Sequence, residues 1–144
     1  MNKSREALYQ KFHESGYPSD PEQKAEFARN LFGAMLVGAA DSAIEDVVNG
    51  IDSKSEYLNN FPSLKALSET QKNELKKLIF KSSSDLLYWV LVKIEDINSR
   101  LSINIEELSE SDEVTKICTV NEEHLKYLFF DWAEEYSDYL NTET

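Results

Sequence analysis

Proline and glycine, the two residues that interrupt helices most strongly, occur only in the first part of this chain. All three Pro lie at or before position 62, and all four Gly lie at or before position 50. A long stretch without either residue favours helix over turns and short strands. The length of 144 residues and the 41% hydrophobic content fit one folded domain rather than a disordered chain. We therefore expect a mainly all-α, compact multi-helix domain that spans residues 1–144.

Start and stop signals predict two helices in the first 50 residues. A short helix is expected from Ser4, as its N-cap, to about Ser15. The letters DPEQ at positions 20–23 combine an Asp N-cap, a Pro in the first helical position and a Gln in the third. They predict a second helix from Pro21 to about Asn49, with Gly50 as its stop.

The second helix is expected to be the buried central element of the domain. Between Leu31 and Ala40 it is apolar on every side, which is typical of a helix that is covered all round. Met35 and Ala39 are then expected to be fully buried. Gly33 and Gly38 lower helix propensity, and we expect a neighbouring element to pack closely there.

A third helix is predicted from Glu69 to about Asn98, packed against the second. Ser68 and Gln71 have the spacing of a capping box. Before them, a short helix is expected to start at Ser53 or Ser55, to run through Phe61 and to end at Pro62. The apolar positions of the third helix keep to one broad face: Leu75, Leu78, Ile79, Ser82, Leu86, Trp89, Val90, Ile94 and Ile97.

Residues 103–120 allow two interpretations, whereas the last helix is well marked. Residues 103–105 and 117–120 have the composition of a short β-ribbon, but residues 104–107 also fit the start of a short helix. We expect Asn121 to cap the last helix. Its apolar face comprises Leu125, Leu128, Phe129, Trp132, Tyr136, Tyr139 and Leu140.

Negative charge is concentrated in the last third of the chain. The chain has 15 Lys and Arg against 27 Asp and Glu, a formal net charge of −12. Residues 1–100 carry 13 basic against 15 acidic residues, whereas residues 101–144 carry two against 12. This charge argues against nucleic-acid binding, which needs Lys and Arg to displace counterions from phosphates. The acidic region either serves only as a solvated, solubilising surface or attracts a basic partner, because a field of one sign steers association.

We interpret the chain as an acidic protein-binding module. A basic protein, such as a toxin nuclease neutralised by an inhibitor or immunity-type protein, is the partner class that fits the charge. The candidate partner-binding residues are Asp131, Glu134, Glu135, Asp138 and Tyr139. An alternative is a non-catalytic adaptor or structural protein whose charge serves solubility. No phosphate-binding, dinucleotide-binding or nucleophile-elbow motif occurs, so we favour a non-catalytic role without a cofactor.

A further alternative is a metal-dependent enzyme. Residues 106–110 (EELSE) followed by residues 135–138 (EYSD) resemble the E-E-x-x-E … E-x-x-D pattern of all-α, MazG-like nucleoside triphosphate pyrophosphatases. The resemblance covers these nine residues. It implies that acids on two helices hold Mg²⁺, which clamps the triphosphate while a water attacks. In this chain the implied ligands are Glu107, Glu110, Glu135 and Asp138.

Composition disfavours several other classes. The single Cys118 cannot form an intramolecular disulfide or a multi-cysteine zinc site. The N-terminus is charged and lacks the apolar stretch of a signal peptide. The longest uncharged apolar run, Leu31–Ala40, is far shorter than the roughly 20 residues that cross a bilayer. We therefore expect a soluble, cytoplasmic protein without a membrane partner; its oligomeric state and the identity of its partner are left open by the sequence.

Overall fold

The computed structural model describes residues 1–53, 59–97 and 102–140, and these residues form a mainly helical protein with a short β-hairpin. Their elements, in chain order, are α1 (Lys3–Ser15), α2 (Pro21–Ser53), the 3₁₀ helix η2 (Pro62–Ala66), α3 (Glu69–Asp96), β1 (Asn104–Leu108), β2 (Val114–Thr119), the 3₁₀ helix η3 (Val120–Glu122) and α4 (Leu125–Tyr136). The expected all-α class with a short β-ribbon is confirmed.

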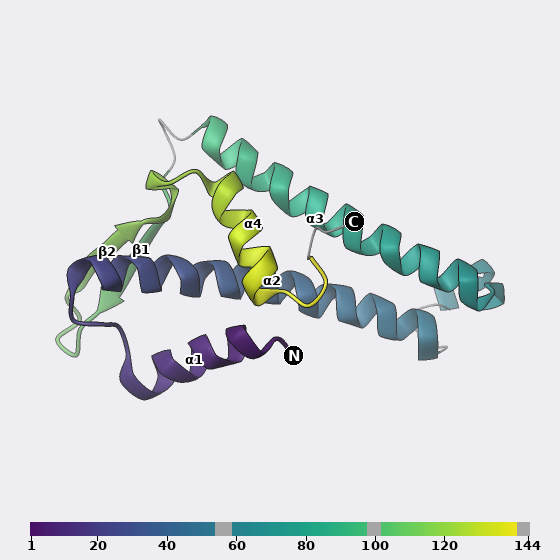
Figure 1. Cartoon of the computed structure of the whole chain (residues 1–144), viewed down its shortest axis with the longest axis horizontal. Coiled ribbons are helices and arrows are strands. Elements are labelled where there is room, and N and C mark those ends of the chain that lie inside the picture. Colours follow the sequence, from purple (N-terminus) through teal and green to yellow (C-terminus); the bar gives the residue numbers. More distant parts are fainter. Residues whose placement is uncertain (54–58, 98–101, 141–144) are drawn as a thin grey trace.

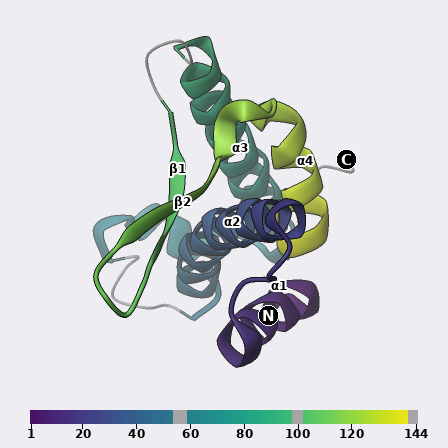
Figure 2. The same cartoon turned by 90° about the vertical axis from the view of Figure 1, so that its left-hand side faces the viewer.

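Helix α2 occupies the centre of the arrangement (Figure 1). It packs against α1, α3, α4 and β2, and α4 also packs against α1 and α3. Seen from the end that carries the hairpin, α1 and α4 lie on one side of α2 and the hairpin lies on the other (Figure 2). The expectation that the second helix is central and packs against the third and last helices is confirmed.

The core forms where α4 meets α2 and α3. Apolar residues of α4 recur at intervals of three and four, so that Leu125, Phe129 and Trp132 all turn inward. The buried cluster comprises Val37, Ile44, Leu91, Val120, Leu125, Phe129, Trp132, Ala133 and Leu140. This packing leaves the opposite side of α4 exposed.

Local capping signals set the starts of α1 and α3. The capping box at α3 is present as predicted: the Gln71 backbone N–H donates to the Ser68 hydroxyl at 3.2 Å, and the Ser68 N–H donates to the Gln71 side chain at 2.9 Å. The prediction of Ser4 as the cap of α1 is wrong. Asn2 has this role, because its side-chain oxygen accepts from the Arg5 N–H at 3.0 Å.

The predicted stop of the second helix at Gly50 is also wrong, since α2 continues to Ser53. Ile51 is buried just after the glycine, and Asp52 forms an ion pair with Lys76 of α3 at 2.8 Å. These contacts outweigh the roughly 1 kcal/mol that Gly costs inside a helix. Most of the short helix expected before Pro62 lies outside the described residues, and Pro62 itself begins η2.

The β-ribbon interpretation of residues 103–120 is correct, and the predicted cap of the last helix is not. Strands β1 and β2 are antiparallel, with Asn104 opposite Thr119. Asn121 is buried in η3, where its side-chain oxygen accepts from the Ile103 N–H at 2.9 Å. The residue in the N-cap position of α4 is His124, whose side chain makes no capping bond and contacts Glu95 of α3 at 2.6 Å instead.

The expected burial of α2 on all sides is contradicted by Met35, which is 60% exposed, and by Ala39, which is also exposed. Only one side of α2 is covered, and its buried apolar residues include Ala28, Leu31, Ala34, Val37, Ile44 and Ile51. A segment that is apolar all round contains no information on which side the neighbours cover. On α3, similarly, much of the predicted apolar face is exposed, whereas its buried residues are Ser84 and Leu91.

Candidate functional site

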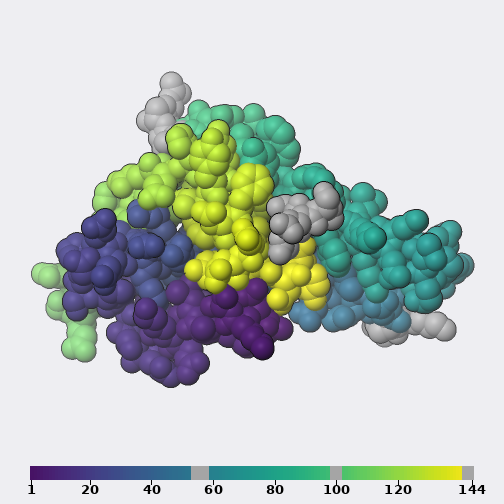
Figure 3. All heavy atoms as spheres, in the orientation of Figure 1, coloured from purple at the N-terminus to yellow at the C-terminus, as the bar shows by residue number. Residues whose placement is uncertain are grey.

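The side of α4 that faces away from the core combines aromatic and acidic residues. The helical repeat of 3.6 residues turns these side chains outward when the apolar face packs inward. We call this surface the α4 outer face; it consists of Tyr127, Phe130, Asp131, Glu134 and Glu135, all exposed. Figure 3 shows α4 lying open on one face of the molecule, bordered by α1.

The three carboxylates of the α4 outer face have no cationic partner among the described residues. Glu134 and Glu135 also lie in the last turn of α4, which contains no basic residue. A negative side chain at this end opposes the helix dipole and costs about 0.3–1 kcal/mol. The negative charge of the α4 outer face therefore forms no ion pair with the described residues and does not stabilise α4.

A hollow of about 440 Å³ lies between this surface and α2. Asn30 of α2 lines it together with Asp131, Trp132, Glu134, Glu135 and Tyr136. Burial raises the pKa of the Tyr136 hydroxyl above its ordinary value of 10.0, and the nearby charges of Glu135 and Glu26 raise this pKa further. Glu26, on α2, thus adds to the negative charge beside α4.

Asp138 and Tyr139 line a second hollow, of about 530 Å³, between α1, α2 and the segment after α4. The Asp138 carboxylate lies 3.6 Å from the N-terminal amine of Met1. Tyr139 is half-buried, and its pKa is raised by burial and then by Glu45, Asp138 and Asp41. The five predicted partner-binding residues therefore line two different hollows. Asp131, Glu134 and Glu135 line the hollow between the α4 outer face and α2, whereas Asp138 and Tyr139 line this second one.

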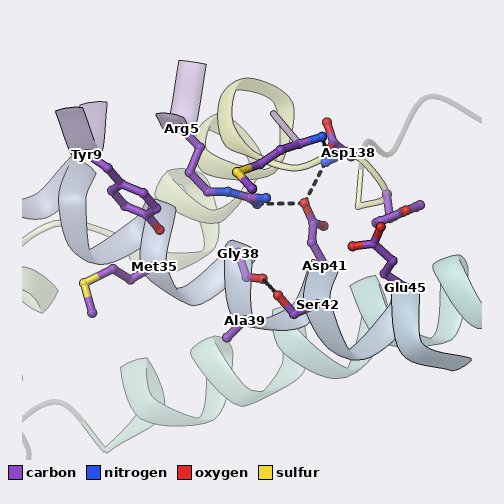
Figure 4. A pocket seen from close by; sticks show the side chains of 11 residues that line it. Arg5, Tyr9, Met35, Gly38, Ala39, Asp41, Ser42, Glu45 and Asp138 are labelled. Atoms are coloured by element: carbon purple, nitrogen blue, oxygen red, sulfur yellow. Dashed lines mark hydrogen bonds and ion pairs between the residues drawn. The ribbon is translucent and has the colours of Figure 1, made fainter. Parts of the chain in front are cut away.

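A buried polar network around Asp41 adjoins the second hollow, and Figure 4 shows its bonds to Arg5 and Asp138. Arg5 of α1 donates to the Asp41 carboxylate at 2.8 Å and to the Tyr136 carbonyl at 2.9 Å. The Ser137 hydroxyl and the Asp138 backbone N–H also donate to Asp41, the latter at 2.8 Å. Asp41 thus joins α1, α2 and the end of α4 through one carboxylate, which fixes the backbone that carries Asp138.

The four acids implied by the pyrophosphatase resemblance do not form a metal site in the described residues. Glu107 lies on strand β1, not on a helix, and pairs with Lys24 of α2. Glu110 lies in the turn of the hairpin, whereas Glu135 and Asp138 lie at the end of α4. The predicted helical setting of the first motif is therefore wrong, because residues 104–108 pair with β2.

Sequence reasoning missed two acids and one surface. Glu26 and Glu45 belong to α2, and only the tertiary packing brings them near Tyr136 and Tyr139. The missed surface is an apolar groove between α2 and α3, about 360 Å³ in volume. The apolar face of the third helix indicated this groove in the sequence. The same pattern is also typical of a helix face that is buried in the core, so the groove was not predicted.

Comparison with protein-family models, with curated proteins and with solved structures gives no match for this chain. Within residues 1–53, 59–97 and 102–140, no helix is both long and apolar enough to cross a membrane.

The raised tyrosine pKa values predict a loss of stability at alkaline pH. Burial raises the pKa of Tyr9, Tyr17, Tyr136 and Tyr139 above 10.0, so folding favours their protonated forms. Their contribution is fully present below this value and is lost as the pH rises through the raised folded-state pKa values. Thermal melts between about pH 8 and pH 11 should therefore show a falling Tm above about pH 10. The variant Tyr136→Phe should lose less Tm over this interval, and an equal loss would show that this hydroxyl does not contribute.

Proposed function

We propose that the protein is a binding module for a basic protein and that the partner docks on the α4 outer face. One observation carries the proposal: the carboxylates of Asp131, Glu134 and Glu135 are exposed and unpaired within the described residues, beside the exposed rings of Tyr127 and Phe130. Charges without internal partners are free to pair with an external cation. Exposed aromatic side chains supply apolar contact area at the same place.

The two kinds of side chain have different roles in this proposal. The carboxylates attract the partner over a distance of about one Debye length, near 10 Å at moderate salt, and so raise the association rate. Tyr127 and Phe130 lose their remaining exposure on contact and so slow dissociation. More specifically, we propose an inhibitor or immunity-type protein that neutralises a basic toxin. Such a protein acts by binding alone.

The test begins with the product of the neighbouring gene, offered to the immobilised full-length protein, followed by capture from an extract of the source cell. For a captured basic protein, the triple variant Asp131→Asn/Glu134→Gln/Glu135→Gln is expected to weaken binding by on the order of tenfold or more at low salt. The variant should fold normally, since surface substitutions usually change stability by within about 0.5 kcal/mol. Its Tm is expected to equal or exceed that of the parent, because two charges that oppose the helix dipole are removed.

A matched control separates the α4 outer face from net charge. The variant Glu106→Gln/Glu110→Gln/Glu113→Gln removes three exposed acids from the hairpin and changes the net charge equally. It should bind nearly as well as the parent protein. Equal weakening by the two triple variants would mean that overall charge, and not the α4 outer face, attracts the partner. Unchanged binding by the α4 variant would refute the proposal.

A further inference from the structure

One side of α3 presents a row of exposed apolar side chains to solvent, with the Lys93–Asp96 ion pair near its C-terminal end. We call it the α3 stripe; it consists of Leu78, Ser82, Leu86, Trp89, Val90 and Ile97. At 100° per residue, these positions fall within an arc of about 120°. Its five large apolar side chains are between 46% and 68% exposed. Isolated exposed apolar residues are common on proteins, whereas apolar patches of several hundred Å² are often functional.

The α3 stripe borders the groove between α2 and α3. The α2 wall is formed by Ala40, Ala43, Ile44 and Val47, and the α3 wall by Ile79, Ser83, Leu86, Leu87 and Val90. None of these residues is charged, and none belongs to α1, α4 or the hairpin. Because α1 and α4 pack elsewhere on α2, the described part of the chain leaves this groove open.

The size of the stripe suits a stable protein interface. Its exposed apolar side chains present roughly 400 Å² of apolar surface, taking about 100 Å² for a full aliphatic side chain and about 250 Å² for Trp. A standard interface buries about 800 Å² on each partner, and about 60% of this area is apolar. The stripe therefore supplies most of the apolar area that one side of such an interface requires.

The charges around the stripe favour a second copy of this chain over a basic partner. Helix α3 contains five Lys and five Asp or Glu, so it is neutral in a chain with a net charge of −12. Lys93, which falls within the same arc, is paired with Asp96 at 3.3 Å. Two copies of an acidic protein repel each other least when their neutral surfaces meet and their acidic C-terminal thirds point away.

The order of side chains along the stripe is self-complementary in size. Trp89 and Val90 lie one turn after Leu86, whereas the small Ser82 and Ser83 lie one turn before it. When two copies of α3 lie antiparallel about Leu86, each Trp89 faces the Ser82–Ser83 position of the other copy, beside the groove. We propose that the protein forms a symmetric homodimer in which the α3 stripes pack antiparallel. Closed two-fold pairing of this kind is the commonest form of protein oligomer.

This inference goes beyond the proposed function and does not depend on it. The α4 outer face shares no residue with the α3 stripe, although its Phe130 ring lies 5.5 Å from the ring of Tyr88, the neighbour of Trp89. Failure of one proposal leaves the other intact, because partner binding and self-association are measured separately.

Sedimentation velocity of the full chain over a concentration series tests the dimer. We expect a species of twice the 16.6 kDa chain mass that dissociates on dilution. Trp89 is half-exposed and Trp132 is buried, so the tryptophan emission should shift to shorter wavelength as the dimer forms. The variant Leu86→Glu, which places a charge at the two-fold axis, should raise the dimer Kd at least about 30-fold.

The matched control is Asn73→Glu, which adds the same charge to α3 at an exposed position about 140° around the helix from Leu86. It should leave the dimer unchanged, and both variants should retain the helical circular dichroism of the parent. A second variant, Leu86→Cys, should form an intermolecular disulfide across the axis, whereas the buried Cys118 of the parent should not. A monomer at every concentration up to hundreds of micromolar, or a dimer that Leu86→Glu does not weaken, would overturn the proposal.

Discussion

Replacing Asp41 with Ala is expected to lower the free energy of unfolding by about 3–5 kcal/mol. Asp41 is 2% exposed, and its carboxylate accepts bonds from Arg5, Ser137 and the Asp138 backbone. The substitution leaves the Arg5 guanidinium, itself buried, without its counter-ion. A buried charge without a partner is far more costly than the pair is favourable. Urea denaturation monitored by circular dichroism measures the loss.

Two further variants identify the cause of this loss. Asp46→Ala removes an exposed acid from the same helix and should change stability by less than about 0.5 kcal/mol. The double variant Arg5→Met/Asp41→Leu should be more stable than Asp41→Ala alone, because no unpaired charge remains. If Asp41→Ala unfolded within about 1 kcal/mol of the parent, the network would not hold α1, α2 and the end of α4 together.

Gly33→Ala is the second substitution for which we expect a large effect, a loss of about 3 kcal/mol. A Cβ atom at Gly33 would lie 2.1 Å from the Trp132 ring, which is buried in the core. Elsewhere inside a helix the same substitution stabilises by about 0.5–1 kcal/mol, so the direction of the change is diagnostic. The Trp132 Nε1 makes no hydrogen bond to the described residues, and the ring is positioned by packing against its neighbours.

Gly38 provides the comparison for Gly33. A Cβ atom at Gly38 would meet the Arg5 side chain at 3.1 Å, a contact that a small shift relieves. Gly38→Ala should therefore cost much less than Gly33→Ala. In addition, Trp132→Leu should recover part of the Gly33→Ala loss in a double-mutant cycle, because it removes the clashing ring. An unchanged or raised Tm for Gly33→Ala would show that Trp132 does not pack on this glycine.

The elements that could be predicted from the sequence are those that local side chains specify. The capping box at Ser68 and the DPEQ signal before α2 act within four residues, and both helices begin where these signals place them. Asn121 is also an N-cap residue type and is followed by two acids, but its side chain bonds Ile103, 18 residues earlier, and so it is not available to cap α4. Local patterns thus failed where a distant partner competes for the same group.

The orientation of α2 and α3 could not be predicted for a related reason. Met35 belongs to a stretch that is apolar all round, so periodicity does not distinguish its covered side from its open side. Trp89 follows the helical repeat of an apolar face, but a face that meets a second molecule has the same repeat as one that meets the core. Which side of each helix is covered depends on tertiary packing.

Part of the candidate site could be predicted because its residues are close together in the sequence. Asp131, Glu134 and Glu135 are close together in the sequence, and helical geometry alone places them on one surface of α4. Glu26 and Glu45 contribute from α2 only after α2 packs beside the C-terminal segment. The division of the predicted residues between two hollows also required the turn after α4, where Ser137 bonds to Asp41.

The ionic-strength dependence of the association rate tests the central claim most directly. With the captured basic protein as partner, stopped-flow mixing over a range of salt concentrations should show a rate that falls steeply as salt rises, while the dissociation rate changes little. The α4 variant Asp131→Asn/Glu134→Gln/Glu135→Gln should show a lower rate at low salt and a shallower fall. A rate for the parent protein that is independent of salt, or a slope that the α4 variant shares with the parent, would contradict docking on the α4 outer face.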